Sequence, residues 1–464
     1  MNKGDIMFKR ILIANRGEVA VRIIRACWEM GIETIAVYST EDKESMHVRL
    51  ADKSVCIGPA SARESYLNIN TIINVAKYYE VDAIHPGYGF LAESSEFARS
   101  CLEHKIKFIG PPSKVIELMG NKILAKKTVK KLGIPIIPGW ERAIIDINEA
   151  EIAINSIGYP ILIKAAKGGG GRGIRKVASK EEFEENFTIC SEEAKRAFDS
   201  DEVYIEKYIS EPRHIEVQIL ADEYKNILIL GERDCSIQRK NQKLIEESPA
   251  TILNDDIRKI IFDYSKKIAA ECNYVNAGTV EFLIDKYENV YFMEMNTRLQ
   301  VEHPVTEMVL GIDIVKEQIR IAYGKALEIK QDNIAVTGHS IECRINAEQP
   351  KKNFCVSAGI IKNINIPGGN GIRVDSGVFA GLNITSSYDS NIAKLIVFDT
   401  NREDCIRKLK RSLSEFVIDG IETNIEFLLE ILNNQKFLTN KHDTYTVNNL
   451  IKESNQRIGV KENE

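Results

Sequence analysis

One short run of the chain holds an unusual density of polar side chains beside an apolar strand pattern. Residues 293–304 contain two carboxylates, a guanidinium and two carboxamides, contributed by Glu294, Asn296, Arg298, Gln300 and Glu302. Side chains of these types at this spacing are suited to bind a charged ligand together with a metal ion. The alternative interpretation is a solvated loop in which Asn296 caps a turn.

Two acidic residues are expected to face each other across a β-hairpin. The strand patterns on either side of residues 285–289 place Glu281 opposite Glu294 and Thr279 opposite Asn296. Side chains opposed in this way have Cβ atoms about 5 Å apart, where like charges destabilise the pair. A divalent cation turns that repulsion into coordination, and ligands that are all oxygens favour Mg2+ or Mn2+ over Zn2+. A slipped register would instead leave the two carboxylates facing solvent.

A glycine-rich segment, Lys164–Gly173, lies between two strand patterns, one at residues 160–163 and one that begins near Ile174. Glycine lets backbone N–H groups approach phosphate oxygens closely, and the flanking cations supply charge. The segment lacks the G-x-x-x-x-G-K-[ST] pattern of a P-loop. A strand, a glycine loop and a second strand are instead typical of a flap over a nucleotide. The alternative is a hairpin tip that binds no ligand.

Two more runs could contribute to a ligand site. Residues 232–243 are rich in cations and follow a strand at 227–230, which indicates a solvated loop or, beside a nucleotide, a clamp for phosphates. His85–Phe90 follows a strand at 81–84 and surrounds Tyr88 with two glycines. Such a turn at the carboxyl end of a strand is either a ligand-binding loop or a purely structural turn.

The elements that must position these residues begin with an alternation of strands and helices. A strand at 11–14, a helix over 17–30 and a strand at 34–38 form a βαβ unit, which predicts a parallel sheet. Because Asn15–Glu18 stands where G-x-G-x-x-G would, a dinucleotide site is disfavoured. Further strands are expected near 54–57, 83–85 and 108–109, and a Lys-rich helix over 113–132. The C-terminal part predicts helices after strands at 341–346, 359–366, 372–374 and 393–397.

Length and composition narrow the class of protein. A chain of 464 residues exceeds what one hydrophobic core supports, so roughly two to four domains are expected. A net charge of −5 gives no global footprint for nucleic acid. Nine cysteines without a C-x-x-C pair argue against a zinc ribbon and fit a reducing compartment. Without an apolar stretch of about 20 residues or a signal-peptide core, we expect a cytoplasmic protein with no membrane partner. No metal-ligand spacing is found at His47, His104, His339 and His442.

Taken together, these segments resemble the biotin carboxylase family, a branch of the ATP-grasp ligases. The match runs from Ile11 to about Leu450 and rests on six motifs: Ile13–Glu18, His85–Phe90, Lys164–Gly173, Glu206–Tyr208, Gln300–Glu307 and Glu342–Glu348. It implies a fold of the α/β and α+β classes. The implied domains are a Rossmann-like N-terminal domain over 1–116, an ATP-grasp domain over 117–333 with a mobile lid at about 134–208, a β-rich C-terminal domain over 334–452, and a frayed tail over 453–464.

The resemblance also implies a role for each matched residue. ATP would be held by Lys122, Lys164, Gly170, Gly171, Glu206, Lys207, Tyr208, Ile209, His214, Gln238 and Asn241. The metal ion, Mg2+ or Mn2+, would be held by Glu281, Glu294 and Asn296. Bicarbonate would be bound by Lys243, Arg298, Gln300 and the Val301 amide, and Glu302 would be the base that deprotonates it. Tyr88 would flank the biotin ring and Arg344 would stabilise its enolate. The catalytic set would be Lys243, Arg298, Glu302 and Arg344.

The implied reaction is the carboxylation of biotin by ATP and bicarbonate through carboxyphosphate. Bicarbonate attacking the γ-phosphate brings two anions together, so Mg2+ and several cations must neutralise them. Carboxyphosphate is labile, which is why a flap must exclude water. Its breakdown would leave CO2 and phosphate. The oxyanion that then develops on the ureido oxygen of biotin requires a fixed guanidinium, which stays protonated.

Three positions depart from the family pattern. Asn241 stands where many relatives carry His, Asn121 replaces an acidic residue, and Ile174 replaces a Met. The first change removes a titratable contact near the phosphates, but none of the three belongs to the catalytic set. The chain also lacks an Ala-Met-Lys-Met biotinylation site, so the resemblance implies biotin on a separate biotin carboxyl carrier protein. Carboxyltransferase subunits and a second copy in a homodimer are the other implied partners.

Four hypotheses differ in the complex or in the chemistry. The first is the biotin carboxylase subunit of acetyl-CoA carboxylase, which begins malonyl-CoA formation in fatty acid synthesis. The second is the same subunit of a pyruvate or propionyl-CoA carboxylase, because no residue of the motifs would contact the final acceptor. A third, another ATP-grasp ligase such as one that carboxylates a purine precursor, would not need the Arg298–Glu302 cluster together with Arg344. The fourth, an inactive regulatory or scaffold homologue, is disfavoured by the intact Lys243, Glu281, Glu294, Arg298 and Glu302.

Overall fold

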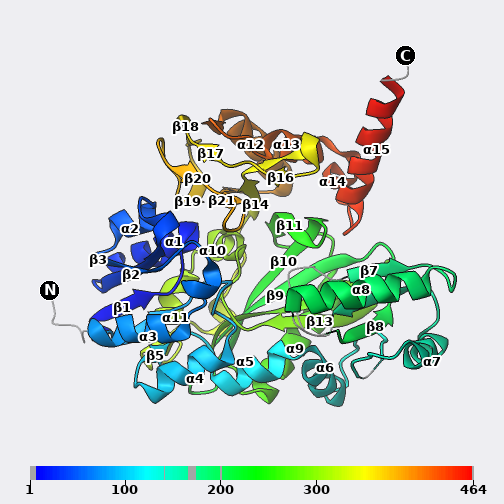
Figure 1. The fold of residues 1–464 in the computed structure, drawn as a ribbon, viewed down its shortest axis with the longest axis horizontal. Coiled ribbons are helices and arrows are strands. Elements are labelled where there is room, and N and C mark those ends of the chain that lie inside the picture. The colour runs from blue at the N-terminus through cyan, green and yellow to red at the C-terminus, as the bar shows by residue number, and fades with distance from the viewer. Residues whose placement is uncertain (1–6, 141, 166–173, 199–200, 462–464) are drawn as a thin grey trace.

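The computed structural model describes residues 7–140, 142–165, 174–198 and 201–461. Its N-terminal part is built on a five-stranded parallel sheet with the order β3-β2-β1-β4-β5 (Figure 1). The strands are β1 (Arg10–Ile13), β2 (Glu33–Ser39), β3 (Lys53–Gly58), β4 (Ala83–His85) and β5 (Lys107–Phe108). The helices are α1 (Gly17–Glu29), α2 (Met46–Leu50), α3 (Ile69–Tyr78) and α4 (Ser95–Glu103). Each strand and the first helix expected in this part are present.

Both faces of this parallel sheet are covered, which explains the apolar runs of its strands. Ile11 and Ile13 pack in one hydrophobic cluster with α1, whereas Leu12 and Ala14 pack in another with α3 and α4. The strand β1 is therefore apolar at every position after Arg10.

A second sheet of eight strands forms the centre and continues into the C-terminal part, with the order β13-β12-β9-β10-β11-β14-β21-β19. Its strands are β9 (Arg213–Ala221), β10 (Ile227–Arg239), β11 (Gln242–Ser248), β12 (Asn276–Ile284), β13 (Val290–Asn296), β14 (His339–Asn346), β19 (Ile372–Ser376) and β21 (Asn391–Asp399). The accompanying helices are α9 (Asp255–Glu271), α10 (His303–Leu310) and α11 (Ile314–Ala322). Helix α10 packs over β10, β11, β14 and β21. It therefore bridges the central and C-terminal parts.

The predicted hairpin register is confirmed. Strands β12 and β13 pair antiparallel with Glu281 opposite Glu294 and Thr279 opposite Asn296, and a bulge follows Glu281.

Of the two interpretations of residues 232–243, a solvated loop or a phosphate clamp, the solvated loop is wrong. Strand β10 runs unbroken to Arg239, turns tightly at Lys240 and Asn241, and returns as β11. Both turn residues have positive φ angles, +48° and +64°, as a two-residue hairpin requires. Two buried charged residues of β10 pair with β9: Arg233 contacts Glu216, and Asp234 contacts Arg213.

The predicted long helix over 113–132 is divided into α5 (Ser113–Gly120) and α6 (Lys122–Lys131). Asn121 separates them, because its Oδ1 accepts hydrogen bonds from the backbone N–H groups of Ile123 and Leu124. An Asn side chain in this position ends one helix and caps the next.

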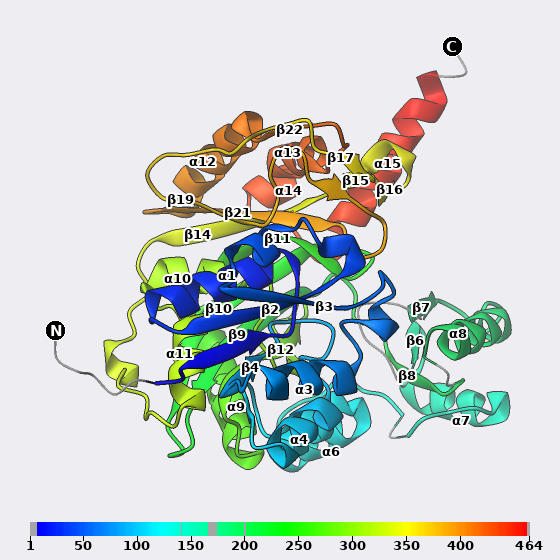
Figure 2. The same ribbon diagram turned by 60° about the vertical axis from the view of Figure 1, so that its left-hand side comes forward.

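The lid subdomain projects from the central sheet on the right of Figure 2. It consists of a three-stranded sheet in the order β7-β6-β8 and two helices. Its elements are α7 (Ile147–Ile157), β6 (Ile161–Ala165), β7 (Ile174–Val177), α8 (Phe183–Phe198) and β8 (Val203–Lys207). The glycine-rich residues 166–173, which include Gly170 and Gly171, lie outside the described residues.

The C-terminal part also contains short strands, which pair in two-stranded sheets of their own, and the helices α12 to α15. The single strand expected at 359–366 is wrong: β17 and β18 replace it, and they pair with different partners, β20 and β22. The short strands are β15 (Glu348–Gln349), β16 (Cys355–Val356), β17 (Gly359–Ile360), β18 (Asn363–Asn365), β20 (Asn383–Ile384) and β22 (Val417–Asp419). The helices are α12 (Arg402–Glu415), α13 (Ile425–Asn433), α14 (Gln435–Leu438) and α15 (Thr446–Lys461). In the described part of the chain, no helix has the length and apolar character needed to cross a bilayer.

Candidate active site

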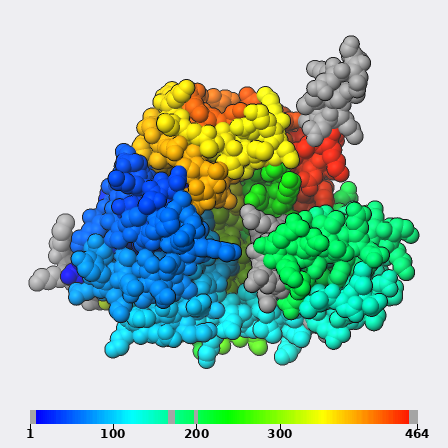
Figure 3. All heavy atoms as spheres, viewed as in Figure 1, coloured from blue at the N-terminus to red at the C-terminus, as the bar shows by residue number. Residues whose placement is uncertain are grey.

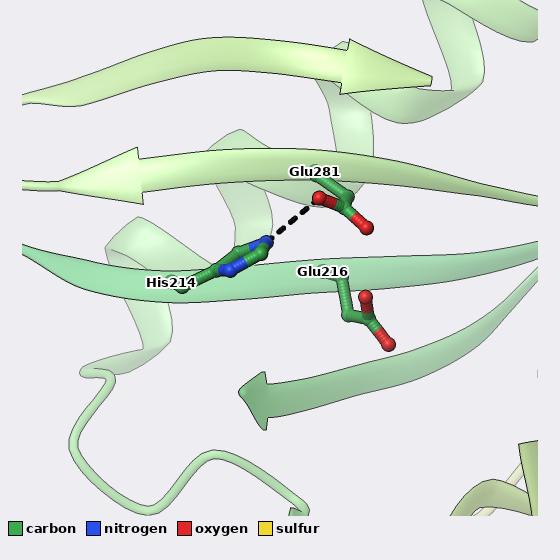
Figure 4. Close-up of side chains that lie close together, drawn as sticks. All are labelled: His214, Glu216 and Glu281. Atoms are coloured by element: carbon green, nitrogen blue, oxygen red, sulfur yellow. Dashed lines mark hydrogen bonds and ion pairs between the residues drawn. The ribbon is translucent and has the colours of Figure 1, made fainter. Parts of the chain in front are cut away.

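Three neighbouring strands of the central sheet present acidic residues on one face. Glu216 of β9 lies opposite Glu281 of β12, which lies opposite Glu294 of β13. His214 points to the same face, since side chains alternate along a strand, and its Nε2 lies 2.8 Å from Glu281 Oε2 (Figure 4). Asn296 donates from Nδ2 to Glu281 Oε1 at 2.7 Å. The residues predicted to surround a metal ion are thus brought together, with Glu216 and His214 beside them.

Lys243 of β11 reaches into this acidic cluster. Its Nζ lies 2.5 Å from Glu216 Oε2, 3.1 Å from Glu281 Oε1 and 2.5 Å from Glu302 Oε1. Burial alone would lower the pKa of the Lys243 amine, but the acidic groups around it raise that pKa well above its usual value. Lys243 is therefore a fixed positive charge surrounded by carboxylates.

Glu302 lies between two cations at the start of α10 and is fully buried. One of its oxygens contacts Lys243, and the other accepts a hydrogen bond from Arg344 at 2.9 Å. Burial would raise the pKa of the Glu302 carboxyl, but Lys243, Arg344 and Arg233 together hold it well below its usual range. Glu302 is consequently an ionised carboxylate that can accept a proton.

Arg298 and Gln300 form an adjoining group of hydrogen-bond donors. The Nε of Arg298 donates to Glu93 Oε2 at 2.9 Å, and its NH1 group donates to Gln300 Oε1 at 3.1 Å. The Nε2 of Gln300 is buried without a hydrogen-bond partner among the described residues. The carbonyl of Val301 accepts from Lys394 at 2.9 Å. A guanidinium beside an unpaired amide N–H suits a small planar anion.

Arg344, on β14, and Tyr88, in the turn after β4, lie beside this cluster. Arg344 lies opposite Lys394 in the β14–β21 ladder, and the Lys394 ammonium lies 5.9 Å from the centre of the Tyr88 ring. The turn that carries Tyr88 is tied to β1, because Asn15 Nδ2 donates to the Pro86 and Tyr88 carbonyls at 2.7 and 2.8 Å. Residues far apart in the sequence thus converge near Lys394.

A second ionic group joins the lid to the central part. Glu206 of β8 accepts from Lys126 of α6 at 2.7 Å and contacts Lys164 of β6. Burial would raise the pKa of Glu206, but Lys164 and Lys126 lower it to about 2. This carboxylate therefore holds two lysines at the hinge of the lid.

The remaining predicted nucleotide residues are divided between this junction, the acidic cluster and the β10–β11 hairpin. Lys207 donates from Nζ to the Gly158 and Tyr159 carbonyls at 3.0 and 2.9 Å, and the Tyr208 ring lies 5.6 Å from that of Tyr445. Gln238 lies 3.4 Å from His214 Nδ1 and so belongs to the acidic cluster. Three of the predicted residues contribute little to the site. Lys122 is the first residue of α6, Ile209 follows β8, and Asn241 is exposed at the tip of the β10–β11 hairpin. In Figure 3 a hollow separates the lid from the N-terminal part, with the C-terminal part above it.

The chain matches known families along nearly its whole length. Residues 7–116 match the model for the biotin carboxylase N-terminal domain, 121–330 match the ATP binding domain of the carbamoyl-phosphate synthase L chain, and 342–449 match the biotin carboxylase C-terminal domain. Biotin carboxylase 1 of Bacillus subtilis (strain 168) is 53% identical over 439 residues, which cover 94% of this chain and 98% of that protein. The chain belongs to the biotin carboxylase family.

Components of other biotin-dependent carboxylases are similar to the same extent. A pyruvate carboxylase subunit of Methanothermobacter thermautotrophicus is 48% identical over 441 residues, which cover 95% of this chain and 90% of that protein. A crystal structure of the Hydrogenobacter thermophilus 2-oxoglutarate carboxylase biotin carboxylase domain dimer contains MgADP, ADP and bicarbonate. It matches with a TM-score of 0.93 at 48% identity, over 96% of this chain and 98% of that chain. The fold is therefore the ATP-grasp biotin carboxylase fold, and the chain is a ligase with biotin carboxylase activity.

Several residues of the biotin carboxylase site were not found by sequence reasoning. Glu216, Lys126 and Glu93 contact Lys243, Glu206 and Arg298 respectively. A signal existed for one of them: His214, Glu216 and Gln218 are polar at every second position of an otherwise apolar strand, β9. That period of two predicts a shared face. For Lys126 and Glu93 the partners are 80 and 205 residues away in the sequence, so no local pattern reveals them.

Proposed function

We propose that this chain carboxylates the biotin of a separate biotin carboxyl carrier protein, using ATP and bicarbonate, in the first half-reaction of an acetyl-CoA carboxylase. The observation that carries the proposal is the buried carboxylate of Glu302, held between Lys243 and Arg344. A base between two cations suits a reaction in which a proton is removed from bicarbonate and the enolate of biotin is later stabilised.

The metal ion of this reaction would be Mg2+ or Mn2+, held by Glu281, Glu294 and Asn296. The fit is supported by two carboxylates that lie directly opposite each other in the hairpin, where without a cation their charges repel. Their oxygens are of the kind that Mg2+ prefers. When bound, the ion would neutralise charge on the ATP phosphates.

ATP would bind at the hinge of the lid. Lys164, Glu206, Lys207, Tyr208 and Ile209 would contact the nucleotide from the lid side, with His214 and Gln238 below it. Lys122, Gly170 and Gly171 are proposed to contact the phosphates. Asn241 is the weakest member of the set, because it is exposed at the tip of the β10–β11 hairpin.

Bicarbonate would lie among Lys243, Arg298, Gln300 and the Val301 amide. The buried Nε2 of Gln300, unpaired among the described residues, supports this placement, because a buried donor without a partner is costly. Glu302 would accept the bicarbonate proton, and Lys243 and Arg298 would neutralise the charge that develops at the attacking oxygen.

Biotin would lie beside Arg344 and Tyr88. Arg344 remains a cation because, although burial alone would lower its pKa, Glu246 and Glu302 raise it. A fixed guanidinium next to the ureido oxygen of biotin would stabilise the enolate that forms before carboxylation. Tyr88 would flank the ring from the N-terminal part.

The final acceptor distinguishes the leading proposal from its alternative. Acetyl-CoA carboxylase is our preferred complex because two similar relatives, from Bacillus subtilis (strain 168) and a Nostoc species, are named biotin carboxylase with no keto-acid acceptor in the name. The alternative, a subunit of a pyruvate or propionyl-CoA carboxylase, is supported by the similarity to the pyruvate carboxylase subunit of Methanothermobacter thermautotrophicus. In either complex we propose a cytoplasmic homodimer that works with carboxyltransferase subunits. The dimer is supported by the related domain dimer, and the compartment by nine cysteines that are all free.

The experiment that tests the reaction measures ADP release by the purified chain with Mg2+ and bicarbonate, with and without free biotin. We expect release that depends on bicarbonate and rises with biotin. ATP binding without either effect would contradict the proposal and favour an inactive homologue. The acceptor is tested separately, by adding the organism's carrier protein and each candidate carboxyltransferase and measuring which acyl or keto acid is carboxylated.

A further inference from the structure

Two buried glutamates that the proposed reaction does not use lie directly opposite each other in the central sheet. Glu246 of β11 pairs with Glu342 of β14, and both side chains are fully buried. Side chains opposed in this way have Cβ atoms about 5 Å apart, where two like charges destabilise the pair. Such a pair in a dry interior must hold a cation or a proton.

The cations near the pair are already engaged. Arg344 donates from Nε to Glu246 Oε1 at 2.7 Å, and its NH2 group also donates to Glu302. The Lys394 ammonium contacts Glu18 at 3.3 Å and the Val301 carbonyl at 2.9 Å. Lys243 contacts three other carboxylates, those of Glu216, Glu281 and Glu302. Among the described residues, both oxygens of Glu342 and the second oxygen of Glu246 have no hydrogen-bond partner.

We propose that Glu246 and Glu342 share a proton, and that the pair is a positioning device for Arg344. Glu246 fixes the guanidinium, while Glu342 remains a neutral acid. This inference rests on the proposed function, in which Arg344 stabilises the biotin enolate. It adds two residues that act through Arg344 and do not touch the reacting atoms.

The charge around Arg344 explains why a neutral acid is needed there. The guanidinium already faces the carboxylates of Glu246 and Glu302. A third negative charge on Glu342 would weaken the attraction between the guanidinium and a developing oxyanion. A proton on the pair removes that charge and leaves the hydrogen bond from Arg344 to Glu246 intact.

The acidities of the two groups agree with this assignment. Burial raises the pKa of Glu246 to about 7; Arg344 lowers it and Glu302 raises it further. Burial raises the pKa of Glu342 well above its usual value. Lys394 lowers this pKa, and Glu246 raises it further. The charged groups that face the pair are thus Arg344 on β14, Lys243 on β11, Lys394 on β21 and Glu302 at the start of α10.

An infrared difference spectrum tests the proton directly. We expect the parent chain at neutral pH to have a C=O stretching band of a protonated carboxylic acid that is lost in Glu342→Gln. Glu18→Gln is the matched control, because Glu18 is another buried carboxyl whose pKa burial raises to about 7. Glu18→Gln should leave the acid band of the Glu246–Glu342 pair in place. If Glu342→Gln does not fold, Glu342→Leu serves instead, since a neutral acid tolerates an apolar replacement of similar volume. An unchanged acid band in the folded variant overturns the shared proton.

Two rates test the positioning role: bicarbonate-dependent ATP hydrolysis without biotin, and biotin carboxylation. Glu246→Gln should lower carboxylation by about tenfold or more, as expected when a charge-stabilising donor is misplaced, with ATP hydrolysis within about threefold of the parent. Glu246→Asp should restore part of the loss. In the parent, we expect the ratio of carboxylation to hydrolysis to decline at higher pH, as the pair ionises. Glu342→Gln should change both rates by less than about twofold near neutral pH, and it should remove that decline. Equal losses in both rates for Glu246→Gln overturn the positioning role. A parent chain with no bicarbonate-dependent hydrolysis contradicts the proposed function instead, and leaves the infrared result standing.

Discussion

As the proposed base, Glu302 has to meet two conflicting requirements. It must be ionised to accept a proton, and the cations around it ensure that by holding its pKa well below the usual range. A carboxylate with so low a pKa is a weak base. Bicarbonate, however, would compete with Glu302 for Lys243 and Arg298. An anion that draws Lys243 away removes the strongest attraction on the Glu302 carboxylate and raises its basicity when the substrate is present.

Replacing this base tests the assignment. Glu302→Gln should reduce bicarbonate-dependent ATP hydrolysis by about 100-fold or more, since an amide cannot accept the proton. ATP binding, measured by calorimetry, should stay within about threefold, because none of the proposed nucleotide residues that the structure describes contacts Glu302 directly. Glu307→Gln, on the same helix but paired with Arg22 and Arg373, is the matched control. Hydrolysis by Glu302→Gln at the parent rate would show that the base lies elsewhere.

Single elements carry the geometry that brings these residues together. The β12–β13 hairpin illustrates how much a local pattern predicts: its register, and so the juxtaposition of Glu281 and Glu294, follows from alternation and turn position. Strand β10 illustrates the limit. Its charges suggest a loop, but Arg233 and Asp234 are neutralised by β9 residues that are distant enough in the sequence to leave no local signal. The core strands and the hairpin could therefore be predicted, whereas the buried ion pairs between strands could not.

The hairpin makes a prediction about metal dependence. Glu294→Gln should raise the Mg2+ concentration needed for half-maximal ATP hydrolysis by about tenfold, because one anionic oxygen ligand is lost. Glu288→Gln, at the exposed turn of the same hairpin, is the control and should match the parent. An unchanged Mg2+ dependence in Glu294→Gln would remove that residue from the metal site.

Helix α6 makes a prediction about stability. Asn121→Ala should destabilise the chain by about 1 kcal/mol, since the backbone N–H groups of Ile123 and Leu124 lose their capping oxygen. Asn121→Asp should be as stable as the parent or more so, because a carboxylate caps the helix and interacts favourably with its dipole. Denaturant unfolding followed by circular dichroism measures both. Equal stability of all three chains would mean that the cap contributes nothing.

At the scale of the whole molecule, the central and C-terminal parts are joined by one eight-stranded sheet and by a buried ionic network. Glu247 of β11 accepts from Arg402 of α12 at 2.6 Å and lies 2.9 Å from His339 Nε2. Asp234 contacts Arg213 at 2.7 Å, and His442 lies 3.6 Å from Asp234 and 3.7 Å from Glu247. These acids and His442 are close enough to hold a metal ion, but Arg213 and Arg402 already neutralise the carboxylates. His339 and His442 are therefore members of a buried ionic network that joins β10, β11 and α12.

This network predicts how the stability of the whole chain depends on pH. Burial would raise the pKa of Glu247, but Arg402 and His339 lower it from 4.5 to about 2. The carboxylate is more acidic in the folded state, so its contribution is complete above about 4.5 and is lost as the pH falls towards 2. Glu247→Gln should therefore be less stable than the parent at pH 7 by about 3–5 kcal/mol, the usual cost of breaking a buried pair. That difference should shrink steadily below pH 4.5.

Glu426→Gln, which removes a fully solvated pair with Lys351, should follow the parent at every pH. The measurement is denaturant unfolding at a series of pH values. A Glu247→Gln difference that stays constant down to pH 3 would mean that the stability of the network does not depend on this charge.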